Sequence, residues 1–351
     1  MRLWLPRSLI IASLGLHVIT LASYSRQPDM MAAFTVYPIW MWSILGLVLS
    51  GTAFLFWRAQ LSLMLACLWI LTVILASDES NVLFNSSHGV PEPGQPKPFY
   101  SEPTIRICTL NWGVNKMKPA ELAKQAQLIA DYHPHILFLQ EITPGHADLI
   151  AKKVYPLERY PNAYDIRTEK GAATITPWEI INTHPNLPHS QHTTLKLPGG
   201  QTIDCVNLQL RSAVTDMRLW QPSCWINHAQ NRKKQRLQVL LCLEYLKTQR
   251  AEHPASSRPV VIAGDFNAPA SDPLHTDTMQ GNKNNGHDFD FYDSFFQVGS
   301  GWANTWHRRM PFQRIDYIYT TRRLKAVRSS NVVIPGSDHL MVVSDFVLLK
   351  P

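Results

Sequence analysis

The charge distribution divides the chain into two dissimilar parts. Residues 8–76 carry almost no charge, whereas most of the charged side chains follow residue 100. The first part contains three apolar runs, Ser8–Tyr24, Ala32–Trp57 and Ala59–Ser77. Each run approaches or exceeds the roughly 20 residues that a helix needs to cross a hydrocarbon core. We therefore expect residues 1–77 to form a membrane domain with three transmembrane helices.

Arginines beside these runs predict the orientation of the membrane domain. Arg2 and Arg7 precede the first run, and Arg58 lies in the short turn between the second and the third. The positive-inside rule places both sites in the cytoplasm. Three crossings then leave everything after Ser77 on the extracytoplasmic side of the cell membrane. A cleaved signal peptide in place of the first helix would leave the same side for this part.

Residues 78–103 are rich in proline, serine, asparagine and glycine, which is typical of an extended linker. The five cysteines show no spacing typical of zinc sites. Cys224 could form a disulfide with Cys242 or Cys205 outside the cytoplasm, and the sequence leaves this open. The net charge of +7 fits either an anionic partner or basic flanks of membrane segments.

Residues 104–351 alternate strand-like and helix-like segments, and strands dominate toward the end. This order predicts an α/β domain with two packed sheets. The expected helices are Lys118–Tyr132, Pro144–Tyr155 and His228–Arg250. The expected strands are Thr104–Leu110, His135–Leu139, Tyr164–Arg167, Ala172–Thr176, Glu179–Asn182, Thr202–Leu210, Val260–Gly264, Arg314–Tyr319, Ala326–Val333 and Leu340–Leu349.

Polar residues lie at the edges of five of these strands. Asp265 and Asn267 follow the apolar run Val260–Gly264, and the loops at strand ends are where open α/β sheets collect ligands. An isolated acidic residue after a strand is usually a turn or cap residue, but five such positions in one domain point to a common site. The other four are Asn111, Glu141, Asp316 and the pair Asp338-His339.

These residues occur in short motifs whose order resembles that of the endonuclease/exonuclease/phosphatase superfamily. The superfamily includes deoxyribonuclease I, apurinic endonucleases, neutral sphingomyelinases and inositol polyphosphate 5-phosphatases. The resemblance runs from about Thr104 to Lys350 and implies a four-layer α/β/β/α sandwich. The membrane-anchored arrangement also resembles bacterial members related to VanJ-type glycopeptide-resistance proteins. The motifs are Asn111, Gln140-Glu141, Gly264-Asp265-Phe266-Asn267, Arg314-Ile315-Asp316-Tyr317 and Ser337-Asp338-His339.

The resemblance implies a metal-dependent phosphoesterase. Glu141 would be the principal metal ligand, with Asn111 and Asp338 in or near the coordination shell. Hard oxygen donors favour Mg²⁺ or Mn²⁺ over zinc. A divalent cation stabilises the negative charge that builds on phosphoryl oxygens during attack.

The remaining motif residues would carry the catalytic roles. Asp265 would orient or deprotonate the attacking water, and Asn267 would donate a hydrogen bond to a phosphoryl oxygen. His339 would contact the phosphate as a base or as an electrostatic stabiliser, with Asp316 fixing its tautomer.

One position departs from the family pattern. Many members carry a histidine two residues beyond an asparagine, and the matching strand here has Asn207 followed by Gln209. Glutamine cannot donate a proton to a departing alkoxide. Either activity is reduced, or another residue protonates the leaving group, or the substrate has a good leaving group such as a phosphate, as in a pyrophosphate-linked lipid. Gln209, Asn207 and Arg211 are candidate phosphate contacts. His184, His189 and His192 could supply the missing acid or bind metal, although a solvated loop is the simpler interpretation.

Three functions remain open from the sequence. The favoured one is a membrane-anchored phosphoesterase that cleaves a phosphate ester or pyrophosphate outside the cytoplasm, on a substrate that could be lipid-linked. The second is a catalytically weakened module that binds anionic headgroups. The third is a membrane-tethered nuclease, which would need a basic groove along the nucleic-acid backbone.

Overall fold

The computed structural model describes eleven stretches of the chain and divides it into two compact units. The helical unit comprises Met1–Phe84, Ala213–Lys233 and Pro269–Pro273, and the sandwich unit comprises the remaining residues. The described residues are 4–77, 79–80, 89–93, 104–113, 119–156, 165–169, 171–184, 190–212, 216–252, 258–279 and 289–350.

The helical unit is built around three apolar helices, α1 (Trp4–Arg26), α3 (Ile39–Trp57) and α4 (Gln60–Ala76). Small residues let these helices approach closely. The Ser13 hydroxyl lies 2.7 Å from that of Ser50 and accepts a hydrogen bond from Trp69 Nε1 at 3.0 Å. A Cβ added to Gly46 would lie 1.9 Å from the Trp69 ring. Close packing over small and hydroxyl-bearing residues is typical of helices that associate in membranes.

Two of these helices, α1 and α3, are long and apolar enough to cross a membrane. Helix α4 has 17 residues and extends about 25 Å, short of the roughly 30 Å of a hydrocarbon core. The expected three transmembrane helices are therefore not confirmed. The second apolar run is also divided, because α2 (Ala32–Thr35) ends before Pro38 and α3 begins after it. Proline disfavours helical geometry in the residue before it.

The sandwich unit contains two six-stranded mixed sheets. In the first sheet the order is β11-β12-β1-β2-β4-β3, and in the second it is β5-β6-β7-β8-β10-β9. The strands are β1 (Thr104–Asn111), β2 (Ile136–Gln140), β3 (Asp165–Glu169), β4 (Ala172–Thr176), β5 (Glu179–His184), β6 (Ser190–Lys196), β7 (Thr202–Gln209), β8 (Val260–Asp265), β9 (Phe291–Asp293), β10 (Asp316–Thr321), β11 (Leu324–Val333) and β12 (Leu340–Leu348).

The three helices expected after residue 104 are present, and the largest difference is at one boundary. Helix α8 (Pro222–Glu252) begins six residues earlier than the expected His228, with a proline at its first position, where the missing N–H costs nothing. Strand β6 was not expected, since its Ser-Gln-His-Thr-Thr sequence lacks an apolar alternation although five of its seven residues are buried. The other helical elements are η1 (Asp29–Met31), α6 (Pro119–Asp131), α7 (Pro144–Val154), η2 (Leu274–Met279) and α9 (Ser294–Val298).

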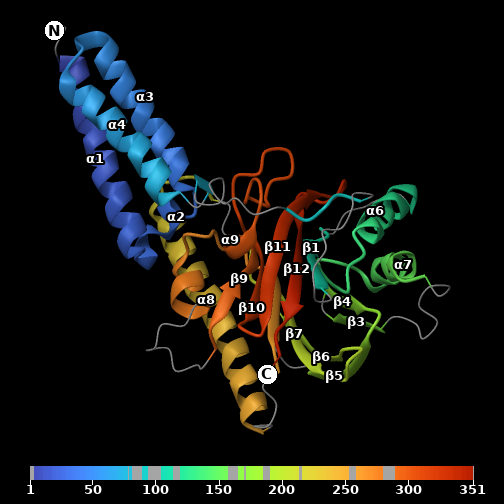
Figure 1. The fold of residues 1–351 in the computed structure, drawn as a ribbon. Helices are drawn as coiled ribbons and strands as arrows, with labels where there is room; N and C mark the ends of the chain where they lie inside the picture. Colours follow the sequence, from blue (N-terminus) through green and yellow to red (C-terminus); the bar gives the residue numbers. More distant parts are fainter. Residues whose placement is uncertain are drawn as a thin grey trace. The chain divides into compact units, whose positions relative to one another are not determined.

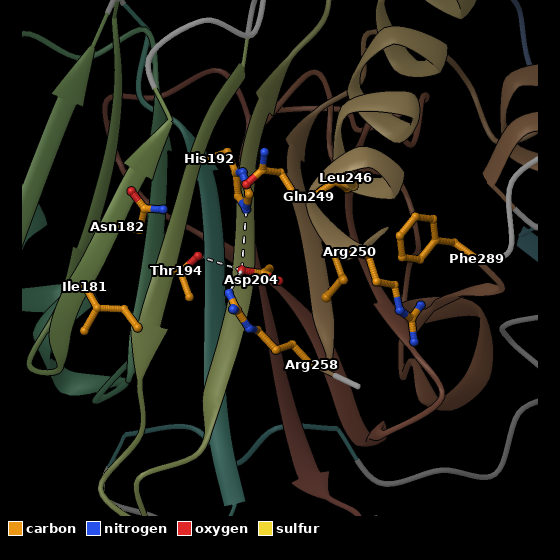
Figure 2. Close-up of a pocket in the computed structure, with 11 residues that line it drawn as sticks. Ile181, Asn182, His192, Thr194, Asp204, Leu246, Gln249, Arg250, Arg258 and Phe289 are labelled. Carbon is orange, nitrogen blue, oxygen red and sulfur yellow. Dashed lines mark hydrogen bonds and ion pairs between the residues drawn. The ribbon is translucent and has the colours of Figure 1, made fainter. Parts of the chain in front are cut away.

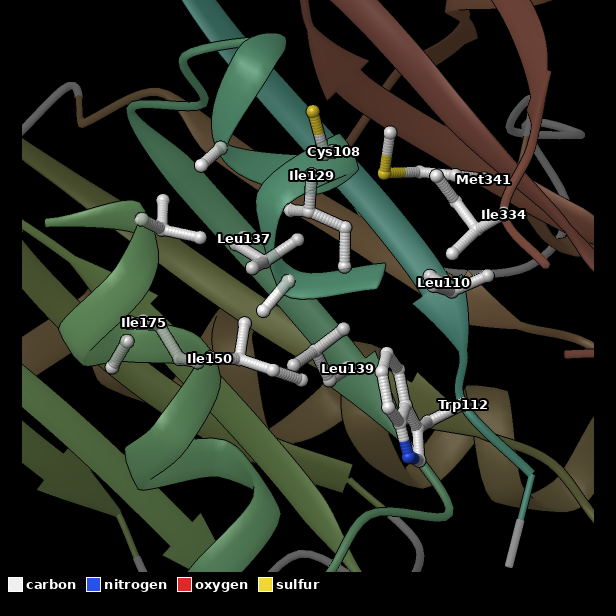
Figure 3. Close-up of a cluster of buried hydrophobic side chains, with 14 of the residues drawn as sticks. Cys108, Leu110, Trp112, Ile129, Leu137, Leu139, Ile150, Ile175, Ile334 and Met341 are labelled. Carbon is white, nitrogen blue, oxygen red and sulfur yellow. The ribbon is translucent and has the colours of Figure 1, made fainter. Parts of the chain in front are cut away.

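Three hydrophobic clusters make the sandwich unit a four-layer α/β/β/α structure, as expected. One cluster lies between the first sheet and helices α6 and α7, and it includes Ile129, Ile150 and Leu137 (Figures 1 and 3). A second joins the two sheets, and Phe138 of β2 is part of it. The third lies between the second sheet and the later part of α8, including Leu243.

The cysteines do not form disulfides. All five are free, and Cys205 and Cys242 are fully buried among apolar side chains of two different clusters. The Cys224 thiol donates a hydrogen bond to the carbonyl oxygen of Asp216 instead. The pairings left open by the sequence are therefore absent.

Candidate active site

The facing sides of the two sheets change from apolar to polar toward one end. In β1, Ile105 and Ile107 pack in the cluster between the sheets, and Asn111 follows on the same face because side chains alternate along a strand. In β8, Val261 and Ala263 precede Asp265 in the same way. In each of five strands a polar residue stands at the end of the row of inward-facing side chains. These residues are Asn111, Gln140, Gln209, Asp265 and Asp316.

Strand register brings these residues together at one edge. Asn111 lies beside Gln140 in the first sheet, whereas Asp265 lies between Gln209 and Asp316 in the second. The two sheets are linked there by the Asn111 amide, which donates to Asp265 Oδ2 at 2.9 Å and to Glu141 Oε1 at 3.2 Å. The structure thus gathers residues from distant parts of the sequence around one point.

Glu141 reaches this point through an unusual backbone conformation. It has a φ of +52°, which is uncommon for a residue other than glycine. Strand alternation would point residue 141 toward the helix layer, and the left-handed conformation returns its side chain to the inner face. There Gln209 Nε2 donates to Glu141 Oε1 at 2.8 Å. Strained backbone of this kind concentrates at functional sites.

Asp265 is held in place by its neighbours. Its Oδ1 accepts the backbone N–H of Asn267, and its Oδ2 accepts Asn267 Nδ2 at 3.0 Å. Asn267 Nδ2 also donates to the carbonyl oxygen of Leu210, so both of its amide hydrogens are engaged within the protein. Gly264 lets β7 and β8 approach, since an added Cβ would lie 1.9 Å from the carbonyl oxygen of Leu208.

His339 and Asp316 form a buried pair. His339 Nδ1 lies 2.8 Å from Asp316 Oδ2, which is the arrangement that fixes the histidine tautomer. The loop before β12 is attached to β1 by Ser337, whose hydroxyl donates to the carbonyl oxygen of Asn111 and accepts from the backbone N–H of His339. Ser337 belongs to the recognised motif, but its role as this link is visible only in the structure.

The electrostatics separate the roles of the two central groups. Burial, together with repulsion from Asp316, raises the pKa of Asp265 to about 7. Burial alone would lower the pKa of His339, but the adjacent Asp316 carboxylate outweighs it and raises the pKa to about 10. At neutral pH the imidazole is therefore charged, while Asp265 can exchange a proton.

The site holds buried carboxylate oxygens of the kind that bind a divalent cation, whereas the His339 imidazolium has no free lone pair for a metal. Single ligand atoms of Asp265, Asp316 and His339 lie within 4.8 Å of one another, and all three residues are buried. Asp316 Oδ1 is buried without a hydrogen-bond partner among the described residues. The three carboxylates, including Glu141, outnumber the one imidazolium, so a cation would relieve the excess negative charge. Hard oxygen donors of this kind fit Mg²⁺ or Mn²⁺.

Three of the predicted site residues lie differently from this group. The Asp338 side chain is exposed and accepts a hydrogen bond from Trp306 Nε1 at 3.2 Å. Asn207 is fully buried between the sheets, where its amide donates to the carbonyl oxygens of Leu139 and Ala173. This contact crosslinks the sheets and leaves Asn207 facing away from solvent. Arg211 is exposed on the loop after β7.

A separate cavity of about 230 Å³ lies toward the other end of β7 (Figure 2). Asp204 lines it near the start of β7, about 17 Å along the strand from Gln209. His192 lies there as well, with Nε2 3.6 Å from Asp204 Oδ1. His192 is thus a buried strand residue and does not replace the missing family histidine. His189 and the side chain of His184 lie outside the described residues.

A sandwich of two sheets with carboxylates, amides and a histidine at one edge defines a phosphoesterase-type protein whose relatives typically depend on a divalent metal. Residues 110–339 match the sequence profile of the Endonuclease/Exonuclease/phosphatase family. The chain belongs to this family.

Solved structures show the same fold. An endonuclease/exonuclease/phosphatase from Bacteroides vulgatus is 16% identical, with a TM-score of 0.51 over 70% of this chain and 100% of that chain. A functionally unknown protein from Enterococcus faecalis V583 gives the same four values. The human Nocturnin catalytic domain, solved with a bound sulfate anion, is 18% identical, with a TM-score of 0.50 over 70% and 95%.

A search of curated proteins finds no match. The finer resemblance to VanJ-type members is therefore not confirmed, and the family assignment rests on the profile match.

The His339–Asp316 pair predicts how stability depends on pH. The pKa of His339 rises from 6.5 to about 10 on folding, so its contribution is complete below pH 6.5 and is lost as the pH rises through 10. The Asp316→Asn variant removes the charge that raises this pKa and should lose this part of the pH dependence. Thermal unfolding followed by tryptophan fluorescence, with a chelator present, would measure it. Parallel curves for variant and wild type from pH 6.5 to 10 would contradict the pairing.

Proposed function

We propose that the protein is a membrane-anchored, Mg²⁺- or Mn²⁺-dependent phosphoric ester hydrolase whose sandwich unit acts outside the cytoplasm. One observation carries the chemistry: the amides of Asn111 and Gln209 hold Glu141, and Asn111 also holds Asp265, so residues of both sheets share one hydrogen-bond network. A fold that needed only stability would not place several carboxylates at this edge, because like charges repel.

Each residue has a role that its surroundings support. Asp265, with a pKa of about 7, is suited to accept a proton from the attacking water near neutral pH. His339 is held as an imidazolium by Asp316, which favours electrostatic stabilisation of a phosphoryl oxygen over a role as base. Asn267 positions Asp265 and would contact phosphate only by exchanging one of its present hydrogen bonds.

The metal would be held by Glu141, with Asn111 in or near its shell. Asp338 would join this shell only by giving up its hydrogen bond to Trp306 Nε1. Glu141 accepts its two amide hydrogen bonds through Oε1, which leaves Oε2 for a cation. When bound, the cation supplies a Lewis acid that stabilises charge on the phosphoryl group.

The leaving group is the point at which this chain differs from many members of its family. Gln209 is engaged with Glu141 and has no proton to donate to an alkoxide. The substrate we propose is a pyrophosphate ester, which could be lipid-linked. Its leaving group is a phosphate, which departs without protonation. This choice agrees with a catalytic unit tethered to a membrane.

Sequence and packing both support the tether and its sidedness. Arg2, Arg7 and Arg58 favour cytoplasmic ends for the apolar helices. Helix α4 packs on α1 through His17 and Thr72, whose polar atoms lie 3.0 Å apart, which supports a third crossing despite its length. An alkaline phosphatase fused after Ser77 should be active, and an inactive fusion would place the sandwich unit in the cytoplasm.

A substrate panel tests the chemistry. The full-length protein in detergent with Mg²⁺ would be given a phosphomonoester, an alkyl phosphodiester, a pyrophosphate ester and a single-stranded oligonucleotide. We expect the pyrophosphate ester to be cleaved fastest. Equal rates on the alkyl phosphodiester would contradict the leaving-group argument. Binding of anionic headgroups without any hydrolysis would instead indicate a binding module, and fast cleavage of the oligonucleotide a nuclease.

A further inference from the structure

A segment from the middle of the chain belongs to the helical unit. Residues 213–233 and 269–273 group with the N-terminal helices, although they are distant from them in sequence. Arg232 makes the attachment: its Nε lies 2.8 Å from Asp272 Oδ2, and its Nη2 donates to Thr35 Oγ1 at 2.6 Å. The Arg232 side chain is only 4% exposed, so this is a buried and specific contact.

The attachment places the segment at one end of the apolar helices. Thr35 lies in the connection between α1, which ends at Arg26, and α3, which begins at Ile39. The end of helix α4 lies beside the start of α3, because Trp40 Nε1 in the first turn of α3 donates to Oε1 of Glu79, which follows α4. Within this unit, Figure 1 shows the beginning of α8 next to α2.

The first residues of the segment lie near the start of α3. Burial, with smaller effects from Cys224 and Asp216, raises the pKa of Tyr37, which places these groups near a residue two positions before α3. Hydrogen bonds link residues within the described part of the segment. His228 Nε2 lies 3.0 Å from the carbonyl oxygen of Asp216, and Trp225 Nε1 donates to that of Leu219 at 2.7 Å.

Three large apolar side chains of this segment are exposed, and Arg218 is exposed between two of them. Met217 is 64% exposed, Trp220 79% and Ile226 55%. Exposed apolar patches usually mark a contact with a partner or a membrane, and these three residues lie within a stretch of ten. Tryptophan is enriched at the level where helices leave the hydrocarbon core. The position of this group, beside the first turn of a candidate span, favours lipid as the partner.

We propose that residues 216–226 form an interfacial anchor that inserts Met217, Trp220 and Ile226 into the boundary between headgroups and acyl chains. This inference rests on the membrane anchoring in the proposed function and adds a second lipid contact to it. The anchor would hold the beginning of α8 against the bilayer surface. Because the three side chains are exposed, substituting them should leave folding intact.

Depth-dependent fluorescence quenching tests the anchor. Full-length protein carrying Cys67→Ser would be given one new cysteine, labelled with bimane and reconstituted into phosphatidylcholine vesicles containing doxyl-labelled lipid. The test site is Trp220→Cys. Leu71→Cys, on the exposed side of α4, reports membrane insertion, and Leu149→Cys, exposed on α7, is the matched control in the sandwich unit.

We expect bimane at position 220 to lose about half of its emission to a shallow 5-doxyl lipid and less to a deep 12-doxyl lipid. Position 71 should be quenched by the deep label, and position 149 by neither. An unquenched position 220 with a quenched position 71 overturns the anchor and leaves the membrane tether intact. An unquenched position 71 overturns the tether and the anchor with it. Equal quenching at 149 and 220 also overturns the anchor, because the contact would not be specific to this segment.

Discussion

Replacing Glu141 with glutamine is expected to lower kcat/KM for phosphoester hydrolysis by about a thousandfold. Metal-ion stabilisation of transition-state charge contributes several kcal/mol, and about 1.4 kcal/mol corresponds to a factor of ten in rate. The amide oxygen of glutamine can still accept from Asn111 and Gln209. Its NH₂ group would then occupy the position of Oε2, where it repels a cation instead of binding it.

The Glu141→Gln variant should also bind Mn²⁺ more weakly, which titration calorimetry measures independently of turnover. Glu179→Gln is the matched control, since Glu179 is an exposed carboxylate that pairs with Lys196 at 3.3 Å on β5. The control should keep the wild-type rate and affinity. A Glu141→Gln variant with an undiminished rate would show that this carboxylate does not hold a catalytic metal.

Replacing Gln209 with histidine is expected to raise the rate on alkyl phosphodiesters by about a hundredfold, the lower end of the usual range for general acid catalysis. An imidazole at this position can keep one N–H directed at Glu141 and use the other to protonate an alkoxide. The phosphate released from a pyrophosphate ester leaves without protonation, so the rate on that substrate should change little. The prediction is therefore a change in selectivity, measured as the ratio of the two kcat/KM values.

Gln209→Leu separates the two roles of the side chain. It removes the donor to Glu141 and supplies no acid, so it should lower the rates on both substrates together. If Gln209→His and Gln209→Leu change both substrates by the same factor, the residue only positions Glu141. The leaving-group argument would then lose its basis.

The sequence alone determined the order of strands and helices from which the sandwich is built. Period-two alternation in Thr104–Leu110 is a local property of the sequence, because successive side chains of any strand point to opposite faces. The continuous apolar run Val260–Gly264 is local as well. The motif order then indicated that Asp265, Asp316 and His339 serve one site, and these three lie together. The apolar runs predicted the helices α1 and α3 for the same local reason.

The sequence did not predict features that depend on contacts between segments distant in the chain. Asn207 is a candidate phosphate contact, and nothing in the sequence indicated that its amide donates to two carbonyl oxygens of the other sheet. Strand β6 has no apolar alternation of its own and is a strand because β5 and β7 pair with both of its edges. Helix α4 proved shorter than its apolar run, since composition cannot say where a helix ends.

The tertiary structure by itself decided which groups touch. The Gln209 side chain donates a hydrogen bond to Glu141, and Glu141 turns toward the inner face through a positive φ. Arg232 joins α8 to the connection after α1. None of these follows from local pattern, because each depends on where two segments distant in sequence come to lie. Alternation and apolar length are set within a few residues, whereas hydrogen-bond partners, and the pKa values that depend on them, are set by the packing of one sheet against the other.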